Sequence, residues 1–267
     1  MEIESDYSKS DYLAVIAERV AAHKKRTYDL MRLNEGDKAL DVGCGPATDT
    51  IALAALVGQT GHVCGVDIDP DQISLAREKA VAAGVEGWTT HQQVAGQQLP
   101  FESNYFDAAR SERVFQHNAD ADALLKEMLR VTKPGGWIIV LDTDWSTMSI
   151  DTDLSAIEQK IKAFHVEKVI KNGYSGRKLQ RLFIQNGLTD LQVELAPTHI
   201  TDYRVSRLVT WYEVTEQAAL DAEIISRDEL TAFHDDLERR DAQGKFFATL
   251  LQILVAGRKP VPQPLRN

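Results

Sequence analysis

Residues 39–54 read ALDVGCGPATDTIALA, and this stretch decides the fold. The residues up to Val42 have the apolar composition of a buried strand, and those from Thr48 onward have the composition of a helix. Between them stand Gly43 and Gly45, which let the backbone turn sharply and approach a ligand closely. A helix N-terminus that follows such a turn can face that ligand. NAD and FAD folds also use a glycine turn, so the turn alone does not identify the ligand.

Strand-like and helix-like segments alternate on both sides of this turn. We expect strands at 38–42, 62–67, 89–94, 106–110 and 137–142, and helices at 48–56, 70–83 and 120–131, after one or two amphipathic helices within 11–33. This alternation predicts βαβ units, right-handed crossovers and a doubly wound α/β sheet. Ligands bind beyond the carboxyl ends of such strands, so functional residues should directly follow them.

In the second half of the chain, strand-like and helix-like segments no longer alternate regularly. This half predicts helices within 151–171 and from 175 to near 187, strands at 191–200 and 246–255, and a charged, helix-rich stretch between those strands. Ser226 and Glu229 form a capping box that opens one of the inserted helices. We interpret the chain as a single domain: an N-terminal helical lid (1–35), a core (36–145), the rest of the sheet and helices (146–200), a helical cap insertion (201–245), and the last strand and tail (246–267).

Composition and charge exclude several classes of protein. The 267 residues carry a formal net charge of −10, which disfavours a nucleic-acid substrate. The two cysteines, Cys44 and Cys64, lack metal-ligand spacing and give no disulfide framework, which favours a reducing, cytoplasmic setting. The polar, acidic N-terminus does not resemble a signal peptide, and the apolar runs are too short to span a membrane.

Two acidic residues narrow the choice of ligand. Asp41 precedes the first glycine by two positions, where its carboxylate can meet a cationic amino group. Asp67 ends the second expected strand, 22 residues after Gly45, at the spacing of a carboxylate that chelates ribose hydroxyls. Asp41 can also be a helix anchor and Asp67 a turn former. Together with the glycines, they indicate a nucleoside-containing ligand.

Several segments resemble one family in unbroken order from residue 36 to residue 145. DVGCG at 41–45 with VDID at 66–69 is similar to the cofactor site of class I S-adenosylmethionine-dependent methyltransferases. QLPF at 98–101, YFD at 105–107, SERVFQH at 111–117 and LRVTKPGG at 129–136 resemble further segments of that family. SERVFQH and LDTDW resemble bacterial small-molecule methyltransferases of secondary metabolism and quinone-like biosynthesis. The resemblance implies a Rossmann-like sheet, mostly parallel with an antiparallel last strand, S-adenosyl-L-methionine as cofactor and S-adenosyl-L-homocysteine as product.

The resemblance also implies a set of cofactor-binding residues. Gly43 and Gly45 would face the methionine part, Asp67 would hold the ribose, and Ile68 would pack on the adenine. The whole set is Asp41, Gly43, Gly45, Thr48, Asp67, Ile68, Gln72, Gly96, Gln97 and Ser111, with Gly96 and Gln97 at the adenine edge and Ser111 under the methionine. This chain departs from the family at Ala47, where a third glycine is common, and at Ala95, where an aspartate often binds the adenine amino group.

Methyl transfer from a sulfonium requires mainly alignment, and a base only where the acceptor loses a proton. His117 is the candidate base, although it can also be a loop histidine or helix cap. Asp142 ends the fifth expected strand; it can orient His117, bind a substrate amine or cap a turn. An NAD-dependent oxidoreductase would not have the SERVFQH and RVTKPGG segments. A metal site is not expected, because the further acid needed after the fourth strand is missing.

Aromatic residues are the candidates for acceptor binding. They are Tyr12, Trp145, Tyr203 and Trp211, each of which can instead be a core residue. We expect a small, aromatic or heterocyclic acceptor methylated on O or N, or on C, with no nucleic-acid or membrane partner, in a monomer or homodimer. The alternative is a non-methylating cofactor-binding protein, cyclase-like or regulatory, on the same scaffold.

Overall fold

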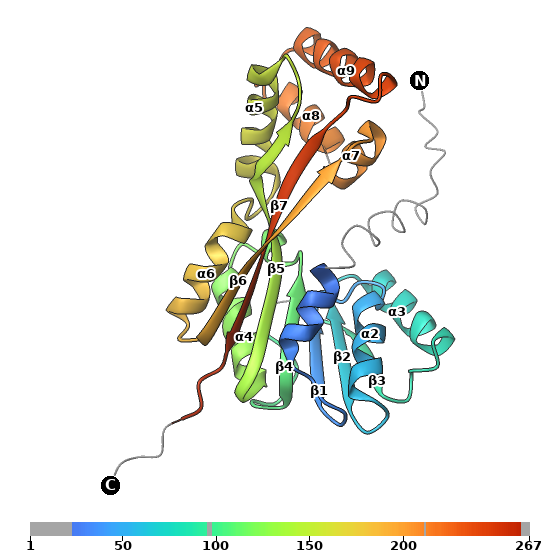
Figure 1. Cartoon of the computed structure of the whole chain (residues 1–267), viewed down its shortest axis with the longest axis vertical. Coiled ribbons are helices and arrows are strands. Elements are labelled where there is room, and N and C mark those ends of the chain that lie inside the picture. The colour runs from blue at the N-terminus through green and yellow to red at the C-terminus, as the bar shows by residue number, and fades with distance from the viewer. Residues whose placement is uncertain (1–22, 95–97, 211, 263–267) are drawn as a thin grey trace. The chain divides into compact units, whose positions relative to one another are not determined.

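The computed structural model describes residues 23–94, 98–210 and 212–262. Its strands are β1 (Lys38–Val42), β2 (His62–Asp67), β3 (Thr89–Gln93), β4 (Phe106–Glu112), β5 (Thr132–Ile150), β6 (Thr189–Ile200) and β7 (Ala248–Arg258). Its helices are α2 (Thr48–Val57), α3 (Pro70–Ala82), α4 (Ala121–Val131), α5 (Ser155–Phe164), α6 (Ser175–Gln185), α7 (Tyr203–Thr210), α8 (Tyr212–Asp221) and α9 (Arg227–Ala242). Residues 23–31 are also helical. Figure 1 labels these strands and the helices α2 to α9. A 3₁₀-helix, η1 (Phe115–His117), follows β4, and a π-helix, η2 (His165–Val169), follows α5.

The strands form one sheet in the order β3-β2-β1-β4-β5-β7-β6. The pairs β1–β2, β1–β4, β2–β3 and β4–β5 are parallel, and the last strands are antiparallel. The fold class predicted from the sequence is therefore confirmed. The chain order reverses between β1 and β4, so the crevice for a ligand lies at the carboxyl ends of these two strands.

β5 differs most from the sequence prediction. The sequence predicts a turn at 134–136 before a strand at 137–142, whereas the structure has one strand from Thr132 to Ile150. Thr132 pairs with Phe106 and Trp137 with Ala108, so five steps along β5 correspond to two steps along β4. The Lys-Pro-Gly-Gly segment thus forms a bulge within the strand, which keeps pairing on both sides of it.

The described residues form two compact units. The first unit comprises residues 25–142, 175–195 and the chain from 253 onward, and its core includes Leu40, Phe106, Phe115 and Ile138. The second unit comprises 143–174 and 196–252, with a core that includes Trp145, Ile161, Tyr212 and Phe233. The interpretation of the chain as one domain with a cap at 201–245 stays a prediction. Within the described ranges, no helix has both the length and the apolar composition needed to cross a membrane.

The capping box predicted at Ser226 is confirmed in the second unit. The Ser226 hydroxyl accepts a hydrogen bond from the backbone N–H of Glu229, and the Glu229 carboxylate accepts one from the backbone N–H of Ser226. Both N–H groups belong to the start of α9, where the helix itself offers them no acceptor. A purely local interaction therefore determines where this helix begins.

Candidate cofactor site and active site

The glycine turn between β1 and α2 is attached to the end of β2. The backbone N–H groups of Gly43 and Cys44 both donate to the carbonyl of Val66, at 2.7 and 3.0 Å. Gly43 has a φ of +76°, and a Cβ placed there would lie 2.1 Å from Cγ2 of Val114. Gly45 also has a positive φ, +49°, yet no atom of the described residues lies within 4 Å of where its Cβ would be. The turn is thus tightly packed at Gly43 and open at Gly45.

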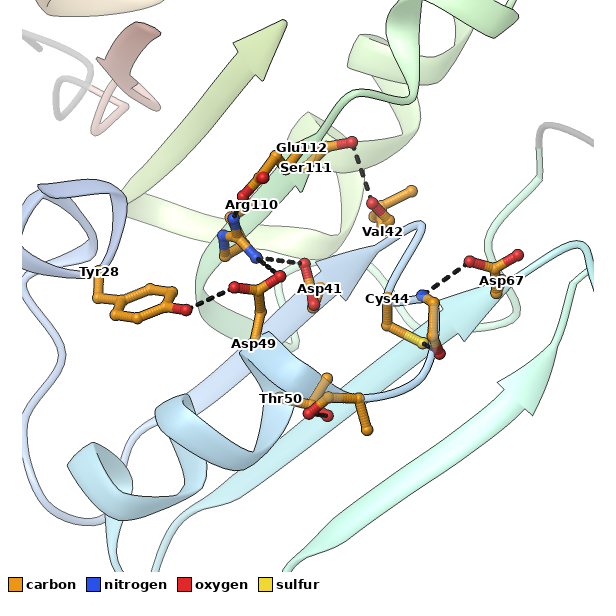
Figure 2. A network of polar contacts seen from close by, with 12 residues as sticks. Tyr28, Asp41, Val42, Cys44, Asp49, Thr50, Asp67, Arg110, Ser111 and Glu112 are labelled. Carbon is orange, nitrogen blue, oxygen red and sulfur yellow. Dashed lines mark hydrogen bonds and ion pairs between the residues drawn. The ribbon is translucent and has the colours of Figure 1, made fainter. Parts of the chain in front are cut away.

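Asp67 lies at the end of β2 with both carboxylate oxygens anchored. Its Oδ2 accepts a hydrogen bond from the backbone N–H of Gly45 at 2.8 Å, and its Oδ1 accepts one from Asp69 at 3.0 Å. Figure 2 shows the bond between the turn and Asp67. A carboxylate oxygen accepts more than one hydrogen bond, so both can still accept from the two hydroxyls of a ribose. The next side chain, Ile68, is 69% exposed and offers an apolar surface to a base.

The beginnings of α2 and α3 frame this turn. Ala47 is the N-cap residue of α2 and has the left-handed conformation, with φ 67° and ψ 16°, at the position where the family often has glycine. Thr48, the first residue of α2, is exposed. Asp69 caps α3 by accepting from the backbone N–H groups of Asp71 and Gln72. The caps of both helices therefore lie at the carboxyl end of the sheet, where a ligand is expected.

A buried arginine, which the sequence prediction missed, lies beside the glycine turn. Arg110 of β4 is 0% exposed. Its Nη1 lies 3.1 Å from both Asp41 Oδ1 and Asp49 Oδ2, and its Nη2 lies 2.6 Å from Glu112 Oε2 (Figure 2). Burial alone would lower the pKa of the guanidinium, but Asp41, Asp49 and Glu112 raise it above its ordinary value. Arg110 is therefore a permanent cation in the first unit.

Tyr28, from the helix at residues 23–31, completes this network. Its hydroxyl donates a 2.5 Å hydrogen bond to Asp49 Oδ1, and the guanidinium of Arg110 lies 5.4 Å from its ring centroid. Burial and the neighbouring Asp49 raise the pKa of the Tyr28 hydroxyl, so it remains a donor. One signal could have revealed the network: an arginine within a strand that is otherwise buried must have partners.

Three carboxyl groups surround this one guanidinium, so acidic groups outnumber basic ones among the described residues of this network. The sequence predicts that Asp41 meets the amino group of a ligand; in the structure, its Oδ1 is bound to Arg110. A contact between Asp41 and a ligand stays a prediction. The surplus of carboxyl groups over the guanidinium favours a cationic ligand over an anionic one at this end of β1.

Ser111 and Cys44 are buried where β1 and β4 end. The Ser111 hydroxyl donates to the carbonyl of Val42 at 3.0 Å and so joins the two strand ends. Its predicted place under the methionine part of a cofactor stays a prediction. Burial, and next the Asp41 carboxylate, raises the pKa of the Cys44 thiol, which therefore stays protonated.

The two candidate catalytic residues are joined through η1. The backbone N–H of Gln116 donates to Asp142 Oδ2 at 3.0 Å, and Asp142 is 0% exposed. The side-chain nitrogen of Gln116 lies 2.9 Å from Nε2 of His117, which is exposed. The structure therefore places Asp142 against the backbone of the short helix that presents His117.

The residues predicted to bind an acceptor have different outcomes. Trp145 and Tyr203 are both buried in the core of the second unit. The Tyr203 hydroxyl accepts from Nη1 of Arg207 at 3.2 Å, and burial raises the pKa of Tyr203 to about 12. Four predicted residues lie outside the described part of the chain: Tyr12, Gly96, Gln97 and Trp211.

Comparisons with known proteins agree with this geometry. A family model described as a methyltransferase domain matches residues 33–187, more than half of the chain. A 37.1 kDa protein in transposon TN4556 of Streptomyces fradiae, described as uncharacterized, is 30% identical over 262 residues, which cover 97% of this chain and 73% of that protein. The demethylmenaquinone methyltransferase of Bacillus cytotoxicus is 40% identical over 131 residues, 49% of this chain. These residues are 55% of that relative, so the match spans about half its length.

A solved structure shares the fold. The YcgJ protein of Bacillus subtilis has a TM-score of 0.61 and 19% identity to this chain, and the match covers 92% of this chain and 99% of YcgJ. At this identity the likeness shows the fold alone.

The residues in the structure fit the cofactor of the family. The doubly anchored Asp67 suits a ribose, the exposed Ile68 suits an adenine, and the surplus of carboxyl groups suits a sulfonium and an ammonium. The chain belongs to the methyltransferase-domain family and is an S-adenosylmethionine-dependent methyltransferase.

Proposed function

We propose that this enzyme methylates an O or N atom, or a C atom, of a small aromatic or heterocyclic metabolite. The observation that supports methyl transfer best is the Asp67 carboxylate, held by the N–H groups of Gly45 and Asp69 beside an open glycine turn. A net charge of −10 argues against the phosphate backbone of a nucleic acid as acceptor. A cytoplasmic location and a monomeric or dimeric state stay predictions.

In the proposed site each residue has a distinct task. Gly43 and Gly45 bring the backbone close to the methionine part, and Asp67 accepts hydrogen bonds from the ribose hydroxyls. Ile68 covers one face of the adenine. The carboxylates of Asp41 and Asp49, which share Arg110, provide negative potential toward the cofactor's positive charges. Thr48, Gln72 and Ser111 complete the proposed set.

When bound, the cofactor supplies a methyl group attached to a positively charged sulfur. The protein's task is to hold the acceptor atom in line with that bond and to exclude water. His117 would accept the proton of a hydroxyl acceptor at a ring nitrogen. Asp142 would act as a positioning residue, because it holds the Gln116 N–H and thereby the backbone of η1.

Calorimetric titration of the purified protein with S-adenosylmethionine and with NAD tests the cofactor site. We expect the wild type to bind S-adenosylmethionine and not NAD. Asp67→Ala should weaken binding of S-adenosylmethionine at least about tenfold, because it removes the acceptor of the ribose hydroxyls; tenfold corresponds to about 1.4 kcal/mol. Asp71→Ala, an exposed aspartate of the first turn of α3, is the matched control and should bind normally. Preferential binding of NAD, or equal binding by Asp67→Ala and wild type, would contradict the proposed site.

Turnover tests the proposed reaction separately. Phenols, amines and heteroaromatic nitrogen compounds are incubated with enzyme and S-adenosylmethionine, and S-adenosylhomocysteine and methylated product are measured by mass spectrometry. We expect at least one of these three classes of compound to give S-adenosylhomocysteine and methylated product in equal amounts. Tight cofactor binding without product from any class would favour the non-methylating alternative.

A further inference from the structure

Three aromatic rings form a buried cluster in the second unit. We call Trp145, His165 and Tyr212 the aromatic cluster; they are 6%, 1% and 3% exposed. The rings of Trp145 and His165 are edge-to-face with centroids 4.8 Å apart, and those of His165 and Tyr212 are edge-to-face at 5.6 Å. The three residues come from β5, η2 and α8, so the fold brings them together over a separation of 67 residues in the chain.

Two polar atoms of this cluster have no hydrogen-bond partner in the part of the chain that the structure describes. Nδ1 of His165 lies 2.7 Å from Oγ1 of Thr215, whereas its Nε2 has no partner among the described residues. The hydroxyl of Tyr212 has none there either. Buried polar side-chain atoms are nearly always hydrogen-bonded, because an unmade bond in an apolar interior is costly. Two such atoms on neighbouring rings can each form a hydrogen bond with a ligand.

The surroundings favour a neutral group. Burial lowers the pKa of His165 to about 4, so its ring is neutral near pH 7. Burial, and next the Glu158 carboxylate, raises the pKa of Tyr212, so its hydroxyl stays protonated. Glu158 already has Lys162 at 3.2 Å as a counter-charge. A charged ligand group would therefore lose its hydration here without gaining an opposite charge.

A hydroxyl group complements both atoms whichever tautomer His165 adopts. It has one hydrogen to donate and two lone pairs to accept with. When Nε2 of His165 carries no hydrogen, the ligand hydroxyl can donate to it and accept from the Tyr212 O–H. In the other tautomer the ligand hydroxyl accepts from the Nε2–H of His165 and also pairs with the Tyr212 hydroxyl. A carbonyl oxygen complements both atoms only when Nε2 of His165 carries the hydrogen, and an ammonium only when it does not. The edges of the Trp145 and His165 rings, with Ile161 and Val166 in the same core, favour an aromatic body for the molecule that carries the hydroxyl.

The backbone supports a functional role for His165. It is the first residue of the π-helix η2, which continues directly from α5. A π-helix is less stable than an α-helix and occurs frequently at functional sites. We propose that the aromatic cluster binds the hydroxyl group of a neutral phenolic small molecule, with His165 Nε2 and Tyr212 Oη as its hydrogen-bonding partners. That this phenol is also the methyl acceptor rests on the proposed function.

Ligand-observed ¹⁹F NMR tests the binding without any turnover. The probe is 4-fluorophenol, and 4-fluoroanisole, whose methyl ether has no hydrogen to donate, is the matched comparison. We expect line broadening of 4-fluorophenol by the wild type, and at least about fivefold weaker binding of 4-fluoroanisole. Tyr212→Phe and His165→Phe should weaken 4-fluorophenol binding by a similar factor and leave 4-fluoroanisole nearly unchanged. Tyr105→Phe, a half-buried tyrosine of the first unit, is the control and should bind as wild type does.

The thermal unfolding midpoint separates recognition from structure. Tyr212→Phe removes a hydroxyl for which the described residues offer no hydrogen-bond partner, so the unfolding midpoint of the variant should equal or exceed that of the wild type. A lower midpoint with unchanged 4-fluorophenol binding would assign Tyr212 a structural role and overturn the proposal. Absence of 4-fluorophenol binding by the wild type would overturn it as well. Phenol binding without methyl transfer would keep this site and contradict only its link to the reaction.

Discussion

Arg110 Nη1 of β4 lies 3.1 Å from Asp41 Oδ1 of β1, two residues before the glycine turn begins. The pair lies at the point where the strand order reverses, so a permanent positive charge is held at the edge of the cofactor site. Asp49 and Glu112 share the same guanidinium, and Tyr28 holds Asp49 from its other side. Arg110 thus offsets part of the charge of the buried carboxylates and holds them in place before any ligand arrives, which reduces reorganisation when a cation binds.

Arg110→Met should lower the free energy of unfolding by about 3–5 kcal/mol, because it leaves buried carboxylates without their counter-charge. Urea denaturation followed by circular dichroism measures the loss. Arg181→Met, an exposed arginine on α6, should change stability by no more than about 0.5 kcal/mol. If the two variants were equally stable, the buried network would have no net structural role.

Gly43→Ala should weaken S-adenosylmethionine binding and destabilise the protein by more than the ~1–2 kcal/mol of a left-handed alanine. Its Cβ would lie 2.1 Å from Val114 Cγ2 in addition to having a φ of +76°. Gly84→Ala is the control, because Gly84 has a similar φ of +67° but its Cβ would have no atom of the described part of the chain within 4 Å. This variant should therefore show only the free-energy cost of the left-handed backbone.

A double mutant separates the two causes at Gly43. Adding Val114→Ala to Gly43→Ala removes the methyl group that clashes, so it should restore part of the lost stability. The coupling free energy from four unfolding curves measures this effect. If the losses in free energy of unfolding were additive, the contact with Val114 would not be the cause of the destabilisation by Gly43→Ala.

His117→Ala should lower kcat on a hydroxyl acceptor by about 10²-fold or more and leave the Kd for S-adenosylmethionine unchanged, because a base acts only on the acceptor. His62→Gln is the control: His62 is the first residue of β2, at the opposite end of the strand from the site. Asp142→Asn should lower kcat less than His117→Ala does. If His117→Ala kept full activity, His117 would have no role in the reaction.

Stability should decrease as the pH falls from about 6.5 to about 4. Burial, and next the charge of Arg77, lowers the pKa of His91 to about 4 from 6.5. In that window the unfolded chain binds a proton that folded His91 does not, so acid favours unfolding by up to ~1.4 kcal/mol per pH unit. His165 contributes in the same direction. The free energies of unfolding of wild type and His91→Gln, compared at pH 7 and pH 5, should show a smaller pH dependence in the variant.

Local patterns predicted the elements near the cofactor site well. The strands at 38–42 and 62–67 and the helix that begins at Thr48 agree with β1, β2 and α2, because burial and glycine placement act over a few neighbouring residues. β5 was mispredicted in length, since its Lys-Pro-Gly-Gly segment has the composition of a turn while pairing with β4 keeps it in the strand. Amino-acid composition indicates only the local backbone preference of a segment. Whether the segment pairs as a strand depends on β4, which is distant in the chain, so composition alone could not predict it.

The sequence by itself determined the mostly parallel sheet, the glycine turn and the place of Asp67 at the end of β2, since each follows from patterns of neighbouring residues in the chain. Only the tertiary structure decided that Arg110 meets Asp41, Asp49 and Glu112, and that the rings of His165 and Tyr212 lie together. The physical reason is that a buried charge or hydroxyl is defined by its partners in space. Arg110 and Asp41 are 69 positions apart in the chain but adjacent in the folded protein, because β1 and β4 pair side by side.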